Sequence, residues 1–205
     1  MTTLPILLDA SSYDTALPLR EGAGFWVRAL ARGIDTLVHL AVALAAAVVA
    51  VILLAIVSAL QGVAPDASLA RLSATTPLGL LAALIGATAM HTLAEGLHGS
   101  TVGKRICGLT VISEDGGPAN LRSALRRSIA YNVDALLFGL IAARKMSESP
   151  RRQRHGDLWG GTQVVRLSSL DAGVRRSWLR FALAATAGAT VDGTVILLEL
   201  ASRLP

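Results

Sequence analysis

The sequence predicts an all-α membrane protein, a small helical bundle of two to four apolar segments with a small cytoplasmic β element. Composition is the first reason: 53% of the 205 residues are hydrophobic and 16% are charged, whereas soluble domains carry about 25% charged residues. Residues 40–57 are the second, because this unbroken apolar run can cross roughly 30 Å of hydrocarbon as a helix. The third is that basic residues flank the apolar segments, as the positive-inside rule requires.

The same composition limits the classes of partner and of activity. Basic flanks of membrane segments explain the net charge of +5, so we expect membrane lipids and no nucleic acid as partners. The single cysteine, Cys107, excludes an intrachain disulfide. The amino terminus lacks the features of a cleavable signal peptide, so we expect the first spanning helix to direct insertion. No local cluster of metal ligands, catalytic triad or nucleotide loop is found, so we expect no metal, no cofactor and no enzymatic activity.

The chain divides into three predicted parts. Residues 1–23 are polar and contain two prolines, which indicates a mobile or surface-lying arm. Residues 24–167 contain the main apolar segments and form the predicted membrane domain. Residues 168–205 hold a last apolar stretch, Trp178 to Leu200, which is either a further span or an interfacial helix. We favour a span.

Two spanning helices are predicted first. One runs from Phe25 to Leu60 and ends at 61–66, where glycine and proline break it. The other is charge-free from 72 to 90, and Pro77 suits its first turn. The loop between them carries one basic residue and the flanks carry several, so we expect a hairpin whose amino terminus is cytoplasmic.

Two short β-branched runs predict strands. Residues 108–113 form the first run, and a turn signal follows it. Asn120 then indicates the cap of a helix that begins near Leu121. Residues 162–167 form the second run, which can pair with 109–112 if the third apolar segment returns to the same side of the membrane.

The third apolar segment, 128–143, has sixteen residues and contains Asp134, so it is marginal as a span. Five basic residues lie between the second and third segments, and nine lie from 144 to 180. A single crossing would put one of these clusters on the wrong side, so we favour a re-entrant or kinked helical hairpin. A plain third span with the basic tail outside is the alternative.

A sequence pattern occurs twice: Arg28 to Asp35 and Arg127 to Asp134 both read R-x-x-A-x-x-x-D. An arginine and an aspartate seven residues apart share one helix face, so the arginine can stay at the headgroups while the aspartate points into the bundle. The repetition suggests an internal pseudo-symmetry, which transport folds often have. His39, one turn after Asp35, is interpreted as a hydrogen-bonded packing residue.

The two aspartates of this pattern are energetically unfavourable within a membrane helix. An ionisable group at the centre of a membrane helix costs about 2.5–3.5 kcal/mol on insertion scales, so Asp35 and Asp134 should face a partner or a cavity. One interpretation is a cation or proton site, with Glu95 and His91 as further members on a neighbouring helix. The other is an Arg–Asp network that fixes helix orientation. The charge partners are Arg28, Arg32 and Arg127.

Residues 99–118 resemble the loop of RDD-family membrane proteins, which carry a G-x-T-x-G-K-R-x-x-G-L-x-V pattern. Residues 152–165 are similar to the closing R-Q-R-x-G-D and G-T-x-V-V elements of that family. The arginine and two aspartates for which the family is named fit Arg28, Asp35 and Asp134. The matching signature positions are Gly103, Lys104, Arg105, Gly108, Arg152, Gln153, Gly156 and Asp157.

The resemblance implies sodium– or potassium–proton exchange for some members and an accessory role beside ATPase-type partners for others. Our first functional hypothesis is therefore monovalent cation/proton transport that uses intramembrane carboxylates. The alternative is a non-catalytic membrane scaffold or accessory subunit that binds partner proteins at the cytoplasmic face through 99–127 and 150–167. Few spans rarely enclose a pathway alone, so we expect a homo-oligomer or other membrane proteins as partners, in a multi-pass arrangement in the cell (inner) membrane.

Overall fold

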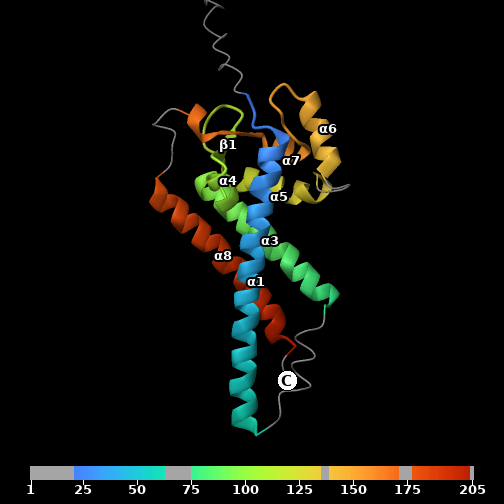
Figure 1. Cartoon of the computed structure of the whole chain (residues 1–205), viewed down its shortest axis with the longest axis vertical. Helices are drawn as coiled ribbons and strands as arrows, with labels where there is room; N and C mark the ends of the chain where they lie inside the picture. The colour runs from blue at the N-terminus through green and yellow to red at the C-terminus, as the bar shows by residue number, and fades with distance from the viewer. Residues whose placement is uncertain (1–20, 63–74, 135–138, 171–176, 204–205) are drawn as a thin grey trace, which may run out of the picture.

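The computed structural model describes residues 21–62, 75–134, 139–170 and 177–203. Three long helices carry a group of short elements at one end (Figure 1). The long helices are α1 (Phe25–Gln61), α3 (Pro77–His98) and α8 (Trp178–Ala201). We call the group at the end the cap; it consists of α4 (Val102–Ile106), β1 (Leu109–Ser113), α5 (Leu121–Asp134), α6 (Leu140–Glu148), α7 (His155–Gly160), β2 (Thr162–Arg166) and the 3-10 helix η3 (Leu167–Ser169).

The bounds of α1 and the place of Pro77 in the first turn of α3 agree with the predictions. Helix α1 stops at Gly62, whose φ of 67° is left-handed and costs glycine no steric strain. Helix α3 starts after Thr76, whose hydroxyl accepts from the Gly79 N–H at 3.0 Å, and Pro77 occupies the first turn. The arm predicted for 1–23 lies almost wholly outside the described residues, as does the start of the second predicted span.

Helices α3 and α8 cross beside α1 (Figure 1), and small residues let their backbones approach. A Cβ at Gly188 of α8 would lie 2.8 Å from the carbonyl oxygen of Met90 on α3. Close contact at small residues is typical of helix pairs in membranes. Within the described residues, α1, α3 and α8 are the helices long and apolar enough to span a membrane, which agrees with the span favoured for 178–200.

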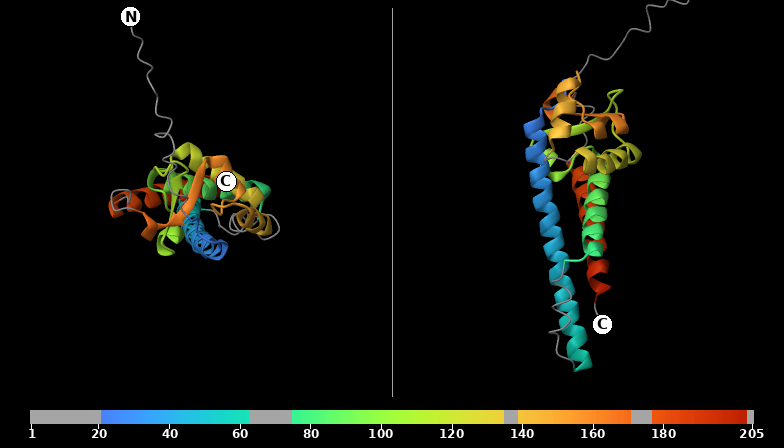
Figure 2. Two further views of the ribbon diagram at one scale, coloured as in Figure 1. Left: turned by 90° about the horizontal axis from the view of Figure 1, so that it is seen from above. Right: turned by 90° about the vertical axis from the view of Figure 1, so that its right-hand side faces the viewer.

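The third apolar segment does not form a span. It is divided between α5 and α6, which have 14 and 9 residues and belong to the cap. Figure 2 shows α5, in yellow, lying across the end of the bundle. Neither helix is long enough to span, which contradicts the alternative of a plain third span and agrees with the favoured hairpin; residues 135–138, between the two helices, lie outside the described part of the chain. Consequently the basic residues of 104–127 and 144–166 lie at the same end of the molecule as the start of α1 (Figure 1).

The predicted strand pairing is confirmed. Strands β1 and β2 are antiparallel, with Leu109 opposite Arg166 and Ser113 opposite Thr162. The predicted cap at Asn120 is also present, because its Oδ1 accepts from the backbone N–H three residues later at 3.0 Å. The strand pair joins the two ends of the segment between them, so the cap is one packed unit on the long helices.

This arrangement predicts that the loops of the cap share one side of the membrane and that α8 ends on the other. With Cys107 replaced by serine, Asp115→Cys and Ser147→Cys should react with an impermeant maleimide from the same side. Ser202→Cys should react from the opposite side, together with Gln61→Cys as the control for the far end of α1. Labelling of Ser147→Cys from the side opposite Asp115→Cys would contradict the three-span arrangement.

Candidate functional site

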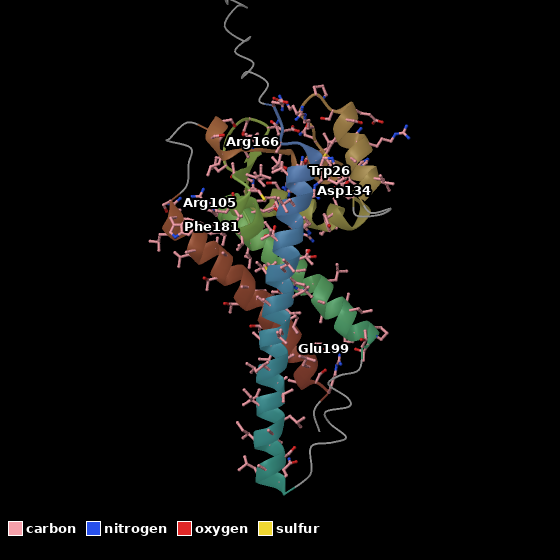
Figure 3. The ribbon with its side chains drawn as sticks, in the orientation of Figure 1. Trp26, Arg105, Asp134, Arg166, Phe181 and Glu199 are labelled. Atoms are coloured by element: carbon pink, nitrogen blue, oxygen red, sulfur yellow. The ribbon has the colours of Figure 1, made fainter. Side chains whose placement is uncertain are left out.

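A cavity of about 340 Å³ lies where α1 and α3 meet the cap. Residues of α5 and α6 contribute its other walls, among them Asp134 at the end of α5, which is labelled in Figure 3. Of the carboxylates predicted for the site, Glu95 and Asp134 line the cavity and Asp35 does not. The ionisable lining residues are Arg28, Arg32, His91, Glu95, Lys104, Arg127, Tyr131, Asp134 and Arg154.

The guanidinium of Arg127 joins the bundle to the cap. Its side chain is 1% exposed; Nε donates to Glu95 of α3 at 2.9 Å and Nη1 donates to Asp157 of α7 at 2.5 Å. Nη1 also donates to the hydroxyl of Thr162 at 2.8 Å. A buried ion pair needs such additional hydrogen bonds to offset desolvation. Gly160 permits the approach, because a Cβ there would lie 2.7 Å from the Arg127 Cγ.

Two more cations extend this contact into a chain of charges. Arg28 donates to the other carboxylate oxygen of Asp157, and Lys104 donates to Glu95. Burial alone would raise the pKa of Asp157, but Arg28 and Arg127 hold that pKa well below its usual value. Burial lowers the pKa of Lys104, and Glu95 opposes that shift. The order Arg28, Asp157, Arg127, Glu95, Lys104 therefore alternates in sign and carries one excess positive charge.

Asp35 and Asp134 each receive the start of a short cap helix. Asp35 accepts from the Gly103 N–H at 2.7 Å and from the Thr101 hydroxyl at 2.6 Å, where α4 begins. Asp134 accepts from the Gly156 N–H at 3.1 Å, where α7 begins. The N–H groups of a first helical turn lack partners within the helix, so a carboxylate is well placed there. Both aspartates are buried. Asp35 connects α1 to the start of α4, and Asp134 connects α5 to the start of α7.

The arginines of the repeated pattern do not pair with the aspartates of their own helices. Arg28 and Arg127 both bond Asp157 instead. The reason is that Asp35 and Asp134 are already bonded to α4 and α7. A network that fixes helix orientation is thus present, with a carboxylate that the repeated pattern does not contain.

The two signature stretches have the same local structure, and each residue of the second lies 53 positions after its counterpart. Gly103 and its counterpart Gly156 both donate to an aspartate. Gly108 and Gly161 both have positive φ, 66° and 60°, directly before a strand. Each glycine therefore allows the same sharp turn from a short helix into a strand.

Side-chain hydrogen bonds also repeat at an offset of 53 positions. The Ser100 hydroxyl donates to the carbonyl of Leu109, the first residue of β1, at 2.9 Å. Its counterpart Gln153 donates from Nε2 to the carbonyl of Thr162, the first residue of β2, at 2.8 Å. The residues directly before Ser100 and Gln153 are also alike in backbone conformation. Gly99 has a φ of 89° and Arg152 has a φ of 51°, so both have positive φ.

The strands show how the two halves are related. Val111 faces Val164 in the antiparallel register, and these two valines are counterparts, so a local two-fold axis passes between them. Helix α1 packs on α4 as α5 packs on α7. The pseudo-symmetry predicted from the repeated pattern thus extends over the short helices and strands. In this relation the hairpin α5–α6 is the counterpart of the longer hairpin α1–α3.

The remaining signature residues bind neighbouring elements. The Arg105 guanidinium lies 5.4 Å from the ring centroid of Trp178 and so contacts the start of α8. The carbonyl of Arg152 accepts from Arg28 at 2.8 Å. Gln153 also donates to Glu114 at 2.6 Å. The signature is therefore largely a set of contacts between the cap and the long helices.

Arg32 and His91 form a contact that spacing did not predict. Nη1 of Arg32 contacts Nε2 of His91, although Glu95 lies four residues after this histidine on the same helix. A guanidinium only donates, so Nε2 accepts and the imidazole is neutral with its proton on Nδ1. Arg32 also lies 3.8 Å from the ring centroid of Tyr131. Among the described residues its side-chain contacts are this histidine and this ring, and no ion pair with a carboxylate is found.

Sequence reasoning missed two lining residues, Tyr131 and Arg154. Tyr131 follows Arg127 by four residues, so it shares that face of α5, and this spacing was a usable signal. Arg154 lies 3.5 Å from carboxylate oxygens of both Asp134 and Asp157. It matches the second arginine of the closing R-Q-R-x-G-D pattern but was not among the predicted site residues, and only the fold shows its role.

Arg127→Leu should lower the free energy of unfolding by about 3–5 kcal/mol, because Glu95 and Asp157 then lose a buried cation. Denaturant unfolding in detergent micelles, followed by circular dichroism, measures the change. Arg126→Leu is the matched control, since Arg126 is exposed on the same helix and its loss should cost within about 0.5 kcal/mol. Equal effects of the two substitutions would contradict the central role of Arg127.

Comparison with known proteins places the chain in a family. The RDD family model matches residues 22–161, which is more than half of the 205 residues. The match includes α1, α3 and the cap up to the start of β2, and α8 lies beyond it. No curated protein and no solved structure matches the chain. With three apolar helices of membrane-spanning length in its described part, the chain is a multi-pass integral membrane protein and belongs to the RDD family.

Proposed function

We propose that the protein binds an anionic amphiphile in the cavity, with a phosphate group against the basic side chains. The observation that carries this proposal is a set of buried N–H donors without a hydrogen-bond partner among the described residues. Two of them belong to the lining, Nδ1 of His91 and Nη2 of Arg127. Nε of Arg154 also makes no hydrogen bond within the described residues, but it lies 3.5 Å from the carboxylates of Asp134 and Asp157. Buried donors normally have partners, and a phosphate group offers several acceptor oxygens at one point.

The charge balance of the lining also favours an anion. Five lining residues are lysine or arginine and two are carboxylates, and Asp157 beside the cavity pairs with three of the five, Arg28, Arg127 and Arg154. Glu95 is already bonded to Lys104 and Arg127, and Asp134 accepts a backbone N–H. Arg32 contributes a charge that no carboxylate of the described residues balances. An anion therefore gains more from this cavity than a cation does.

The cavity lies at the depth expected for lipid headgroups. Helix α5 lies across the end of the bundle (Figure 2) and exposes Leu121, Leu125 and Ile129, spaced four residues apart. An amphipathic helix of this kind lies in the membrane interface. Phe25 and Met146 give the cavity an apolar wall, which suits an acyl chain beside the phosphate group.

The hypotheses drawn from sequence stay predictions. Cation/proton transport finds little support at Asp35, Asp134 and Glu95, because each already accepts from donors of the chain. The scaffold role through 99–127 and 150–167 is compatible with lipid binding, as is association into oligomers. We further propose that the cap faces the cytoplasm in the cell membrane, because basic residues gather at its end of the bundle.

Binding of phosphatidylglycerol to the purified full-length chain tests the proposal. The lipid is titrated into a neutral detergent, and native mass spectrometry reads the lipid-bound fraction, with phosphatidylcholine as the reference. Arg32→Gln should weaken binding about tenfold or more, because a hydrogen bond to a charged group contributes roughly 1.5–3 kcal/mol. Arg126→Gln removes the same charge outside the cavity and should change binding less than about twofold.

A parallel titration with inorganic phosphate separates the two sources of the phosphate group. Preferential binding of phosphatidylglycerol, weakened in Arg32→Gln, supports an amphiphile site. Binding of inorganic phosphate alone would assign the cavity to a free anion and overturn the amphiphile. Equal binding of phosphatidylglycerol by Arg32→Gln and the unaltered protein would show that the lipid binds elsewhere.

A further inference from the structure

His39 of α1 and Asp192 of α8 meet inside the bundle of long helices. Nδ1 of His39 lies 2.7 Å from Oδ2 of Asp192, and the carboxylate side chain is fully buried. His39 lies about four turns after the start of α1, on the membrane side of the cap. Asp192 lies outside the residues that the RDD family model matches. Ionisable residues at such depth are costly and usually functional.

The second carboxylate oxygen of Asp192 faces α3. Oδ1 is buried and has no hydrogen-bond partner among the described residues. Gly86 lies directly against it, since a Cβ at Gly86 would lie 2.2 Å from Oδ1. The carboxylate is therefore enclosed where α1, α3 and α8 meet; one oxygen is bonded to an imidazole, and the other has no hydrogen bond within the described part of the chain.

No lysine or arginine of the described residues pairs with Asp192. On α1 the nearest ionisable group is Asp35, which is bonded to the start of α4. On α3 it is His91, which already accepts from an arginine. On α8, Arg180 and Glu199 lie about three and two turns away. His39 is thus the one described side chain that can supply Asp192 with a compensating positive charge.

We propose that His39 and Asp192 form a proton-binding site within the membrane-spanning part of the protein. With imidazolium and carboxylate the pair is neutral. Uptake of one further proton forms a carboxylic acid at Oδ1, leaves the Nδ1–H of His39 in place and raises the net charge of the pair by one. The pair joins α1 to α8 against α3, so its protonation alters the contact among all three spans. The site is independent of the anion cavity.

Infrared difference spectroscopy of the full-length chain in bilayers, between about pH 8 and pH 5, measures proton uptake. The unaltered protein should gain a carboxylic acid carbonyl band that shifts in heavy water, and Asp192→Asn should abolish it. His39→Gln should show the band already at the higher pH, because burial without a cation favours the neutral acid. Asp115→Asn, which removes an exposed carboxylate of the cap, should leave the band unchanged.

Two results would overturn the proposal. One is the absence of an Asp192-dependent carboxylic acid band in both the unaltered protein and His39→Gln, which would mean that the carboxylate takes up no proton. The other is a band in the unaltered protein that does not change with pH, which would mean a permanently protonated packing contact. His39→Gln keeps the experiment decisive if Asp192→Asn does not fold.

Discussion

The buried guanidinium of Arg127 constrains the positions of the surrounding elements. It requires two carboxylates, which Glu95 of α3 and Asp157 of α7 supply, so both helices must approach α5 closely. Glycines make this approach possible; any larger residue at Gly160 would meet the arginine side chain. Loss of one partner of a buried ion pair costs far more than an exposed pair contributes, so the cap and the bundle cannot shift independently.

Repetition within the chain explains how one short sequence forms both a membrane bundle and a cap. Each half contributes a helical hairpin, a short helix held by an aspartate, and a strand. The first hairpin is long enough to span, whereas the second remains in the cap. Charged residues from both halves therefore lie together around the cavity, between the long helices and the cap. Cations exceed carboxylates in the lining of the cavity, and this excess is the basis of the proposed anion site.

Sequence reasoning predicted the features that depend on local pattern. The ends of α1, the cap at Asn120 and the pairing of the two strands follow from apolar length, capping residues and β-branched runs. It could not predict that Arg28 bonds Asp157, because those residues are 129 positions apart and a spacing of seven shows only a shared helix face. The contact of His39 with Asp192, across 153 positions, was missed for the same reason.

A double-mutant cycle between Arg28 and Glu95 tests most directly whether the buried charges form one network. The two residues are linked through Asp157 and Arg127. Arg28→Gln removes a cation and Glu95→Gln removes an anion, so the double variant restores the charge balance. A connected network predicts that the double variant is less destabilised than the sum of the single variants by more than about 0.5 kcal/mol. Additivity within about 0.3 kcal/mol would show that the ion pairs are independent and would contradict the network.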